Sequence, residues 1–223
     1  MFIKKYYLSA CFTLLLGLLA VILGACGLGS TPSTPLAALT IAARFTEESA
    51  ATASALQSIS GNNILVLSLN DNSYLHLFAY DVNSRRLLRL TNGPQDDISP
   101  ALSPDRKALA FASRRDDRWD LYLLDMEKGE LTQVTDTAAY DGAPSWSPDG
   151  LWLAYETYLD ENLEIAVLSV GDVTQPPIRL TADPAADHSP AWAPQGRQVA
   201  FVSNRSGDSE IWLADLDQTG QRY

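Results

Sequence analysis

The strongest constraint on the fold is a motif that occurs three times between residues 97 and 196. The copies span residues 97–105, 141–150 and 187–196 and read DISPALSPD, DGAPSWSPDG and DHSPAWAPQG. Their first residues, Asp97, Asp141 and Asp187, are 44 and then 46 residues apart. A repeat of about 40–45 residues is the length of one blade of a β-propeller.

Short apolar runs of β-branched and aromatic residues follow each copy, separated by polar turn residues. We expect strands at residues 108–112, 151–155 and 199–202, then at 120–125, 164–168 and 210–215, and closing strands that end in Thr at 131–135 and 178–181. Runs of this kind at regular spacing are typical of all-β proteins. Together with the motif strand they give four strands per repeat, which is the composition of a propeller blade.

A partial repeat comes before the first motif. It has runs at residues 64–67, 75–81 and 87–91 but no motif strand, and the last repeat has no closing run ending in Thr. We therefore divide the chain into repeats at 61–91 (partial), 92–135, 136–181 and 182–223. These 163 residues hold about 3.6 units of about 45 residues. The predicted fold is an all-β, incomplete and open propeller of about four four-stranded blades.

Residues that recur once per repeat are interpreted as scaffold. These residues are Asp97, Pro100, Asp141, Pro144, Trp146, Asp149, Gly150, Asp187, Pro190, Trp192 and Gly196. The three leading aspartates could instead form a ring of metal ligands, but we expect them to bond N–H groups of a neighbouring loop. The two tryptophans could line a ligand funnel, but their register favours a position between blades.

The Ser-Pro-Asp-Gly segment of the motif has the chemistry of a tight turn. Pro presets the first turn residue, the Asp carboxylate caps the turn, and Gly accepts a positive φ. Three positions depart from the pattern: Leu102 replaces the Trp, Arg106 replaces the Gly, and Gln195 replaces the turn Asp.

These motifs resemble the propeller repeats of the TolB family, whose pattern is Pro-Ala-Trp-Ser-Pro-Asp-Gly. Residues 203–212, which read SNRSGDSEIW, are similar to the second hairpin of the family's blade. The resemblance covers residues 61–223 and implies a propeller that binds a protein or ligand at the cell envelope. Related propellers suggest two alternatives, the propeller portion of a prolyl-oligopeptidase-like hydrolase and a carbohydrate-binding propeller. Fold alone does not decide between these functions.

The first 25 residues have the layout of a secretory signal. Lys4 and Lys5 precede an uncharged apolar run that ends in Leu23-Gly24-Ala25-Cys26. This ending resembles the bacterial lipobox, which implies cleavage before Cys26 and a lipid on its thiol. An uncleaved membrane-spanning anchor is the alternative. Residues 26–60 are interpreted as a low-complexity tether that could hold a short helix around 41–59.

Composition excludes several function classes. With 16 basic and 27 acidic residues the net charge is −11, so we expect no nucleic-acid partner. Two Cys and two His leave little material for a zinc site or a His-based catalytic centre, so we expect no enzyme and no cofactor. The expected partners are the membrane, through the lipid on Cys26, and an envelope protein. Two open four-blade arcs could also associate into a ring of eight.

Overall fold

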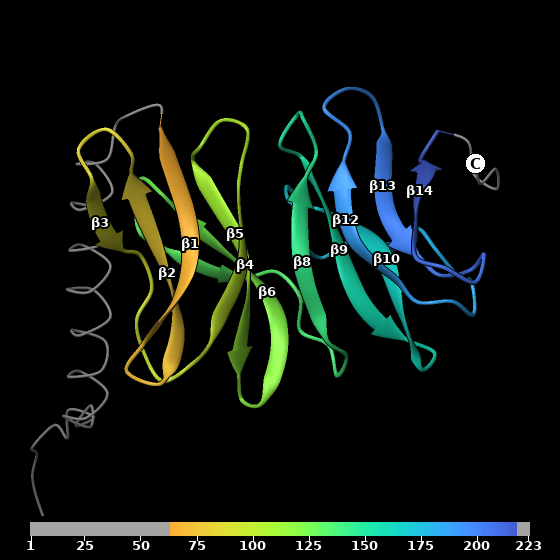
Figure 1. Cartoon of the computed structure of the whole chain (residues 1–223), viewed down its shortest axis with the longest axis horizontal. Coiled ribbons are helices and arrows are strands. Elements are labelled where there is room, and N and C mark those ends of the chain that lie inside the picture. The colour runs from red at the N-terminus through yellow and green to blue at the C-terminus, as the bar shows by residue number, and fades with distance from the viewer. Residues whose placement is uncertain (1–62, 218–223) are drawn as a thin grey trace, which may run out of the picture.

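The computed structural model describes residues 63–217, which form 14 β-strands (Figure 1). The all-β prediction is confirmed for this part of the chain. No helix that could cross a membrane occurs among these residues. The predicted signal segment, Cys26 and the tether with its short helix lie outside the described residues.

The strands form four separate antiparallel sheets, which we call blades 1 to 4. Blade 1 contains β1 (Ile64–Asp71), β2 (Tyr74–Asp81) and β3 (Arg86–Arg89). Blade 2 contains β4 (Asp97–Leu102), β5 (Ala108–Arg115), β6 (Arg118–Asp125) and β7 (Leu131–Gln133). Blade 3 contains β8 (Asp141–Trp146), β9 (Trp152–Leu159), β10 (Asn162–Ser169) and β11 (Ile178–Arg179). Blade 4 contains β12 (Asp187–Trp192), β13 (Gln198–Ser203) and β14 (Glu210–Asp215).

The two long strands of blades 1 to 3 are joined by two-residue turns. The turn residues are Asn72-Ser73, Asp116-Asp117 and Asp160-Glu161, and all six have positive φ values between 49° and 78°. Two positive φ values define the turn whose twist matches that of the flanking strands. Asn and Asp tolerate this conformation better than other non-glycine residues. The polar pairs between the apolar runs therefore fix the register of these hairpins.

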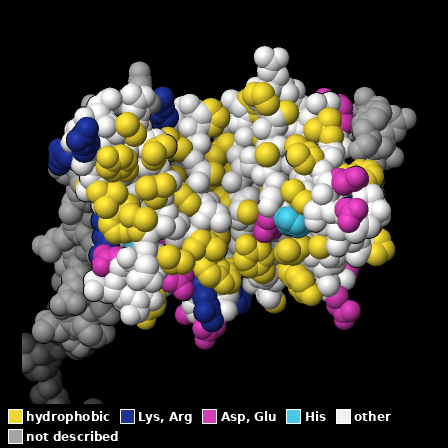
Figure 2. All heavy atoms as spheres, viewed as in Figure 1, with side chains coloured by type: hydrophobic (Ala, Val, Ile, Leu, Met, Phe, Trp, Pro, Cys, Tyr) yellow, Lys and Arg dark blue, Asp and Glu magenta, His cyan; other side chains and the backbone are white. Residues whose placement is uncertain are grey.

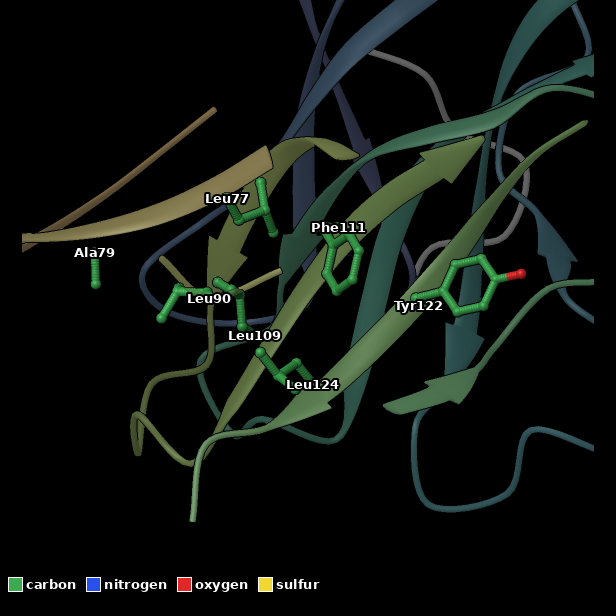
Figure 3. Packing of buried hydrophobic residues seen from close by; sticks show 7 residues of the cluster. All are labelled: Leu77, Ala79, Leu90, Leu109, Phe111, Tyr122 and Leu124. Carbon is green, nitrogen blue, oxygen red and sulfur yellow. The ribbon is translucent and has the colours of Figure 1, made fainter. Parts of the chain in front are cut away.

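The hydrophobic core lies between neighbouring blades. Figure 3 shows the cluster formed by Leu77, Ala79 and Leu90 of blade 1 with Leu109, Phe111, Tyr122 and Leu124 of blade 2. Equivalent clusters join blade 2 to blade 3 and blade 3 to blade 4. Each blade is thus stabilised mainly by its neighbours, as in other repeat proteins.

The arc of blades is open. Figure 1 shows the four sheets in chain order along the long axis of the molecule, with blade 1 and blade 4 at opposite ends. No strand pairing among the described residues joins these two blades. Blade 1 begins at β1 without a motif strand, and blade 4 has no closing strand beside β14 in the described part of the chain. The predicted incomplete, open propeller is therefore confirmed.

Candidate functional site

Each of the three motif aspartates is the first residue of the inner strand of its blade. Asp97, Asp141 and Asp187 begin β4, β8 and β12, and all three are fully buried. They pair across the sheet with Ser113, Thr157 and Ser203, respectively. Burial of a carboxylate is costly unless it is paired or well hydrogen-bonded. The neighbours of each aspartate therefore determine whether its buried carboxylate raises or lowers the stability of the blade.

In blade 4 the aspartate is held by an arginine of the same blade. Arg205 Nη2 donates to both carboxylate oxygens of Asp187, at 2.8 and 2.7 Å. The guanidinium also lies 4.8 Å from the ring centroid of Trp212, and its Nε donates to Ser203 Oγ at 2.9 Å. This arrangement differs from our expectation, because the partner is a guanidinium and not the backbone N–H groups of a loop. A charge-assisted bond satisfies a buried carboxylate more fully than neutral donors do.

Blade 2 has the same Ser-x-Arg arrangement. Arg115 Nε donates to Ser113 Oγ at 3.1 Å, and its guanidinium lies 4.7 Å from the Tyr122 ring. Burial raises the pKa of Asp97, and the positive charge of Arg115 is one of the weaker effects that oppose this. Neither carboxylate oxygen of Asp97 has a hydrogen-bond partner among the described residues, so Arg115 does not pair with it as the arginine of blade 4 pairs with its aspartate. Arg115, the last residue of β5, therefore contacts the scaffold through Ser113 and Tyr122.

Blade 3 departs from the pattern at the aspartate's partner. Leu159 occupies the position that corresponds to Arg115 and Arg205, and Ala166 the position of Tyr122 and Trp212. Thr137 Oγ1 donates to Asp141 Oδ2 at 3.0 Å, while Oδ1 has no hydrogen-bond partner among the described residues. Burial raises the pKa of Asp141, and nearby threonine hydroxyls offset this only in part. Blade 3 thus contains a buried carboxylate without the cation found in blade 4.

The prolines of the motif lie within a β-bulge of each inner strand. The register shifts between residues 98 and 101, 142 and 145, and 188 and 191. The residue before each proline, Ser99, Ala143 or Ser189, has a φ of 53°, 47° or 55°. Pro100, Pro144 and Pro190 thus lie where a bulge has already interrupted the ladder, which is where a strand tolerates proline.

The turn after β8 has the predicted geometry, and its positive φ recurs in the other two turns. Ser147 Oγ donates to Asp149 Oδ1 at 2.5 Å, and the N–H of Leu151 donates to the same carboxylate oxygen at 2.9 Å. Gly150 has a φ of 71° and Gly196 a φ of 76°. Arg106 adopts a φ of 64° at the equivalent position, so it has the backbone conformation that the pattern assigns to glycine.

The motif tryptophans lie between blades. The ring of Trp192 is buried in the cluster between blades 3 and 4, and the backbone N–H of this residue donates to Ser145 Oγ of blade 3 at 2.9 Å. Trp146 packs in the cluster between blades 2 and 3, and its Nε1 donates to the carbonyl of Ala101 in blade 2 at 2.8 Å. Each tryptophan therefore fixes its blade against the preceding one, by ring packing and one hydrogen bond across the interface.

Both tryptophans also border grooves between neighbouring blades. These grooves lie at the end of the strands where the Ser-Pro-Asp-Gly turns are. The larger groove has a volume of about 500 Å³ and lies between blades 2 and 3, where Trp146, Leu151, Lys107 and Asp149 contribute to its lining. The smaller groove has a volume of about 300 Å³ and lies between blades 3 and 4, beside Trp192 and Arg197. The repeat thus creates two related grooves, each with a tryptophan wall and acidic and basic side chains.

A second polar contact joins blades 3 and 4 at the other end of the strands. Glu156 is almost completely buried, and its Oε1 accepts a hydrogen bond of 2.5 Å from the N–H of Ser189 in blade 4. Burial, followed by the charge of Glu156, raises the pKa of Tyr140 to about 12. Sequence reasoning missed Glu156, because a single acid within an apolar strand shows no repeat. Its position inside the run YETYL was the available signal.

The remaining acids do not form a metal centre in the part of the chain that the structure describes. Residues 63–217 contain no group of three or more His, Cys, Asp or Glu side chains that could hold a metal ion. Glu164, another buried acid, is instead paired with Arg179 at 3.0 Å.

The folded residues define an open segment of a β-propeller whose blades are joined by apolar clusters and motif tryptophans. A model of the TolB β-propeller domain matches residues 98–222. The chain belongs to this TolB propeller family. No curated protein matches the sequence.

Solved structures agree with this assignment. TolB from Acinetobacter baumannii is 26% identical, with a TM-score of 0.65 over 75% of this chain and 43% of that chain. A TolB structure from Agrobacterium tumefaciens is 22% identical, with a TM-score of 0.62 over 72% of this chain and 59% of that chain. A puromycin-hydrolysing peptidase of Mycobacterium tuberculosis is similar in fold, at 18% identity and a TM-score of 0.53 over 71% of this chain and 28% of that chain. The chain thus spans about half the length of the TolB structures.

Proposed function

We propose that this protein is a lipid-anchored, extracytoplasmic propeller that binds a protein or ligand at the cell envelope and is not an enzyme. Membership of the TolB propeller family supports a binding role. The sequence before the propeller supports the extracytoplasmic, membrane-anchored location, because an apolar run ending at Cys26 has the layout of a lipoprotein signal. A tether behind Cys26 would let the propeller reach a partner near the membrane surface.

The observation that carries the binding role is the pair of related grooves between blades. Each combines a tryptophan wall with acidic and basic side chains, which is the mixture of apolar area and polar anchors found in binding sites. The larger groove contains Lys107, Asp105 and Asp149, and the smaller one contains Arg197 and shares Asp149. Leu151 lines the larger groove and is 57% exposed, so an apolar contact surface faces solvent there. A peptide segment with an apolar side chain and flanking charges fits this chemistry.

Affinity capture from detergent-solubilised envelope, with the full chain as bait, tests the proposal. A Leu151→Lys variant alters the groove without removing a buried side chain. A Leu131→Lys variant is the matched control, since Leu131 is 41% exposed on the outer strand β7. We expect one specific partner to be captured by the wild type and the control but lost with Leu151→Lys. Equal capture by all three proteins would refute a role for the groove.

A further inference from the structure

The two ends of the arc expose residues that are buried at every internal blade interface. We call the side of a blade that faces the preceding blade its leading face and the opposite side its trailing face. Phe111, Tyr155 and Phe201 occupy one position of the leading faces of blades 2, 3 and 4, with exposures of 0%, 2% and 4%. In blade 1 the same position holds Leu67, which is 38% exposed.

A second position of the leading face shows the same contrast. Leu109, Leu153 and Val199 are completely buried in blades 2 to 4, whereas Leu65 of blade 1 is 53% exposed. Phe78 and Tyr80 pair with Leu67 and Leu65 across β1 and β2, so all four side chains lie on this face. Figure 2 shows hydrophobic side chains gathered over the blade 1 end of the molecule.

The trailing face of blade 4 contains the most exposed large hydrophobic side chain among residues 63–217, which is Ile211. Leu121 of blade 2 and Ile165 of blade 3 are completely buried at one trailing position. Ile211 occupies that position in blade 4 and is 82% exposed. Val202 pairs with Ile211 and Leu213 pairs with Ala200, so these four residues form an apolar trailing face. A large exposed apolar side chain at a position buried in the neighbouring repeats marks an interface without its partner.

The two open faces are complementary in side-chain size, as the faces of the internal interfaces are. Between blades 2 and 3, the trailing residues Ala110, Ala112 and Leu121 pack against the larger leading residues Leu153 and Tyr155. The trailing face of blade 4 likewise consists of small and aliphatic side chains. The leading face of blade 1 consists of two leucines and two aromatic rings, which is the larger half of such an interface.

We propose that the trailing face of blade 4 binds the leading face of blade 1 of a second copy of this chain. One chain carries both halves of the contact, so the interface continues the internal series of blades from one copy into the next. A contact between unlike faces closes into a ring if the rotation allows it and otherwise gives an open assembly. This proposal does not depend on the proposed envelope function, because it concerns the two ends of the arc and not the grooves.

Disulfide cross-linking of the full chain tests this contact. Two proteins are prepared in a background without native thiols, Cys11→Ser and Cys26→Ser, one with Leu67→Cys and the other with Ile211→Cys. These two sites correspond to Phe201 and Ile165, which belong to one cluster between blades 3 and 4. Mild oxidation of the mixture should give a covalent heterodimer, while each protein alone should give little dimer. A mixture of Leu67→Cys with Leu131→Cys is the matched control, because Leu131 is exposed on the outer edge of blade 2.

A second measurement keeps the test independent of disulfide geometry. Ile211→Lys changes a side chain that is exposed in the single chain, so we expect the fold to tolerate it. The variant should associate at least tenfold more weakly than the wild type in sedimentation, with an unchanged unfolding transition. The proposal is wrong if the first mixture gives no more heterodimer than the control mixture. It is equally wrong if wild type and Ile211→Lys sediment alike as monomers at micromolar concentration.

Discussion

Replacing the buried carboxylate of blade 3 by an amide should stabilise the protein. The change Asp141→Asn preserves the shape of the side chain and the acceptor for Thr137 Oγ1, and it removes a charge that has no paired cation. The same change in blade 4, Asp187→Asn, removes the partner of Arg205, whose side chain is only 9% exposed. Two isosteric substitutions at one position of the repeat should therefore have opposite effects.

The contacts of the two aspartates determine how much each substitution should change the free energy of unfolding. Breaking a buried ion pair by removing one partner costs roughly 3–5 kcal/mol, because the other charge stays buried. Arg205 retains its contacts with Trp212 and Ser203 Oγ, so we expect a loss near 3 kcal/mol for Asp187→Asn. An unsatisfied buried polar atom costs about 1–3 kcal/mol. Removal of the unpaired buried charge by Asp141→Asn should outweigh the cost of any unmet hydrogen bond of the amide and yield a net gain of about 1 kcal/mol.

The gain at Asp141 should depend on pH in a defined direction. Burial raises the folded-state pKa of Asp141 above its value in the unfolded chain. The charged form therefore lowers stability above the folded-state pKa, and this cost disappears as the pH falls through that pKa toward the unfolded value. The advantage of Asp141→Asn should be largest at pH 7 and should shrink on acidification toward pH 4.

Urea unfolding followed by tryptophan fluorescence at pH 7 and pH 4.5 measures these free energies of unfolding. A Leu159→Arg variant gives an independent check, since it places a guanidinium two residues after Thr157, as Arg205 follows Ser203. It should stabilise the wild type but not the Asp141→Asn protein. The reasoning fails if Asp141→Asn and Asp187→Asn are equally destabilising at pH 7, because the missing cation would then be irrelevant.

Three further predictions concern the turn glycine, the motif tryptophans and the anchor. Gly150→Ala should lower the free energy of unfolding by about 1 kcal/mol, because an added Cβ has room but φ is 71°. Arg106→Gly should raise it by a similar amount in the same urea assay, because φ is 64° there. Trp146→Ala and Trp192→Ala should each cost roughly 3–5 kcal/mol in thermal unfolding; a small loss of stability with loss of ligand binding would favour a ligand site instead. Cys26→Ser should release the protein from membranes or leave it uncleaved, and unchanged mass and lipid labelling would contradict lipidation.

The blade organisation could be predicted because turn residues recur in the sequence at fixed offsets from the strands. Pro, Asp and Gly at fixed offsets specify the turn at residues 147–150, and polar pairs such as Asp116-Asp117 specify the hairpins. These signals act over a few residues, so they are visible without knowledge of the fold. The absence of a motif strand from blade 1 within residues 63–217 could be predicted for the same reason, since the sequence before β1 has no copy of the turn motif.

The bulges could not be predicted from residue type. Ser99, Ala143 and Ser189 are not glycines, yet all three have positive φ. Their conformation is imposed by the pairing on either side of the shift, between residues 142 and 145 for example. Ladder contacts distant in sequence therefore determine this feature, and local preference opposes it.

The partners of the aspartates depend on a comparison between repeats. Asp187 and Arg205 are 18 residues apart, and only the pairing of β12 with β13 brings them together. The signal was nevertheless present, because Ser-x-Arg occurs at residues 113–115 and 203–205 and is replaced by Thr-x-Leu at 157–159. Residues shared by all repeats identify the scaffold. The replacement of Arg by Leu in one repeat identifies the blade whose aspartate has no guanidinium partner.

Blade 3 shows why such a difference can persist in a propeller. It lacks the guanidinium that pairs with the motif aspartate in blade 4, but the N–H of Ser189 in blade 4 donates to Glu156, a contact specific to this blade. The equivalent residues of blades 2 and 4 are Ala112 and Val202, which cannot make this bond. Because each blade contacts only its neighbours, an unfavourable charge within one blade can be offset at one interface without changing the other blades. The stability of blade 3 should accordingly depend more on blade 4 than on its own inner strand.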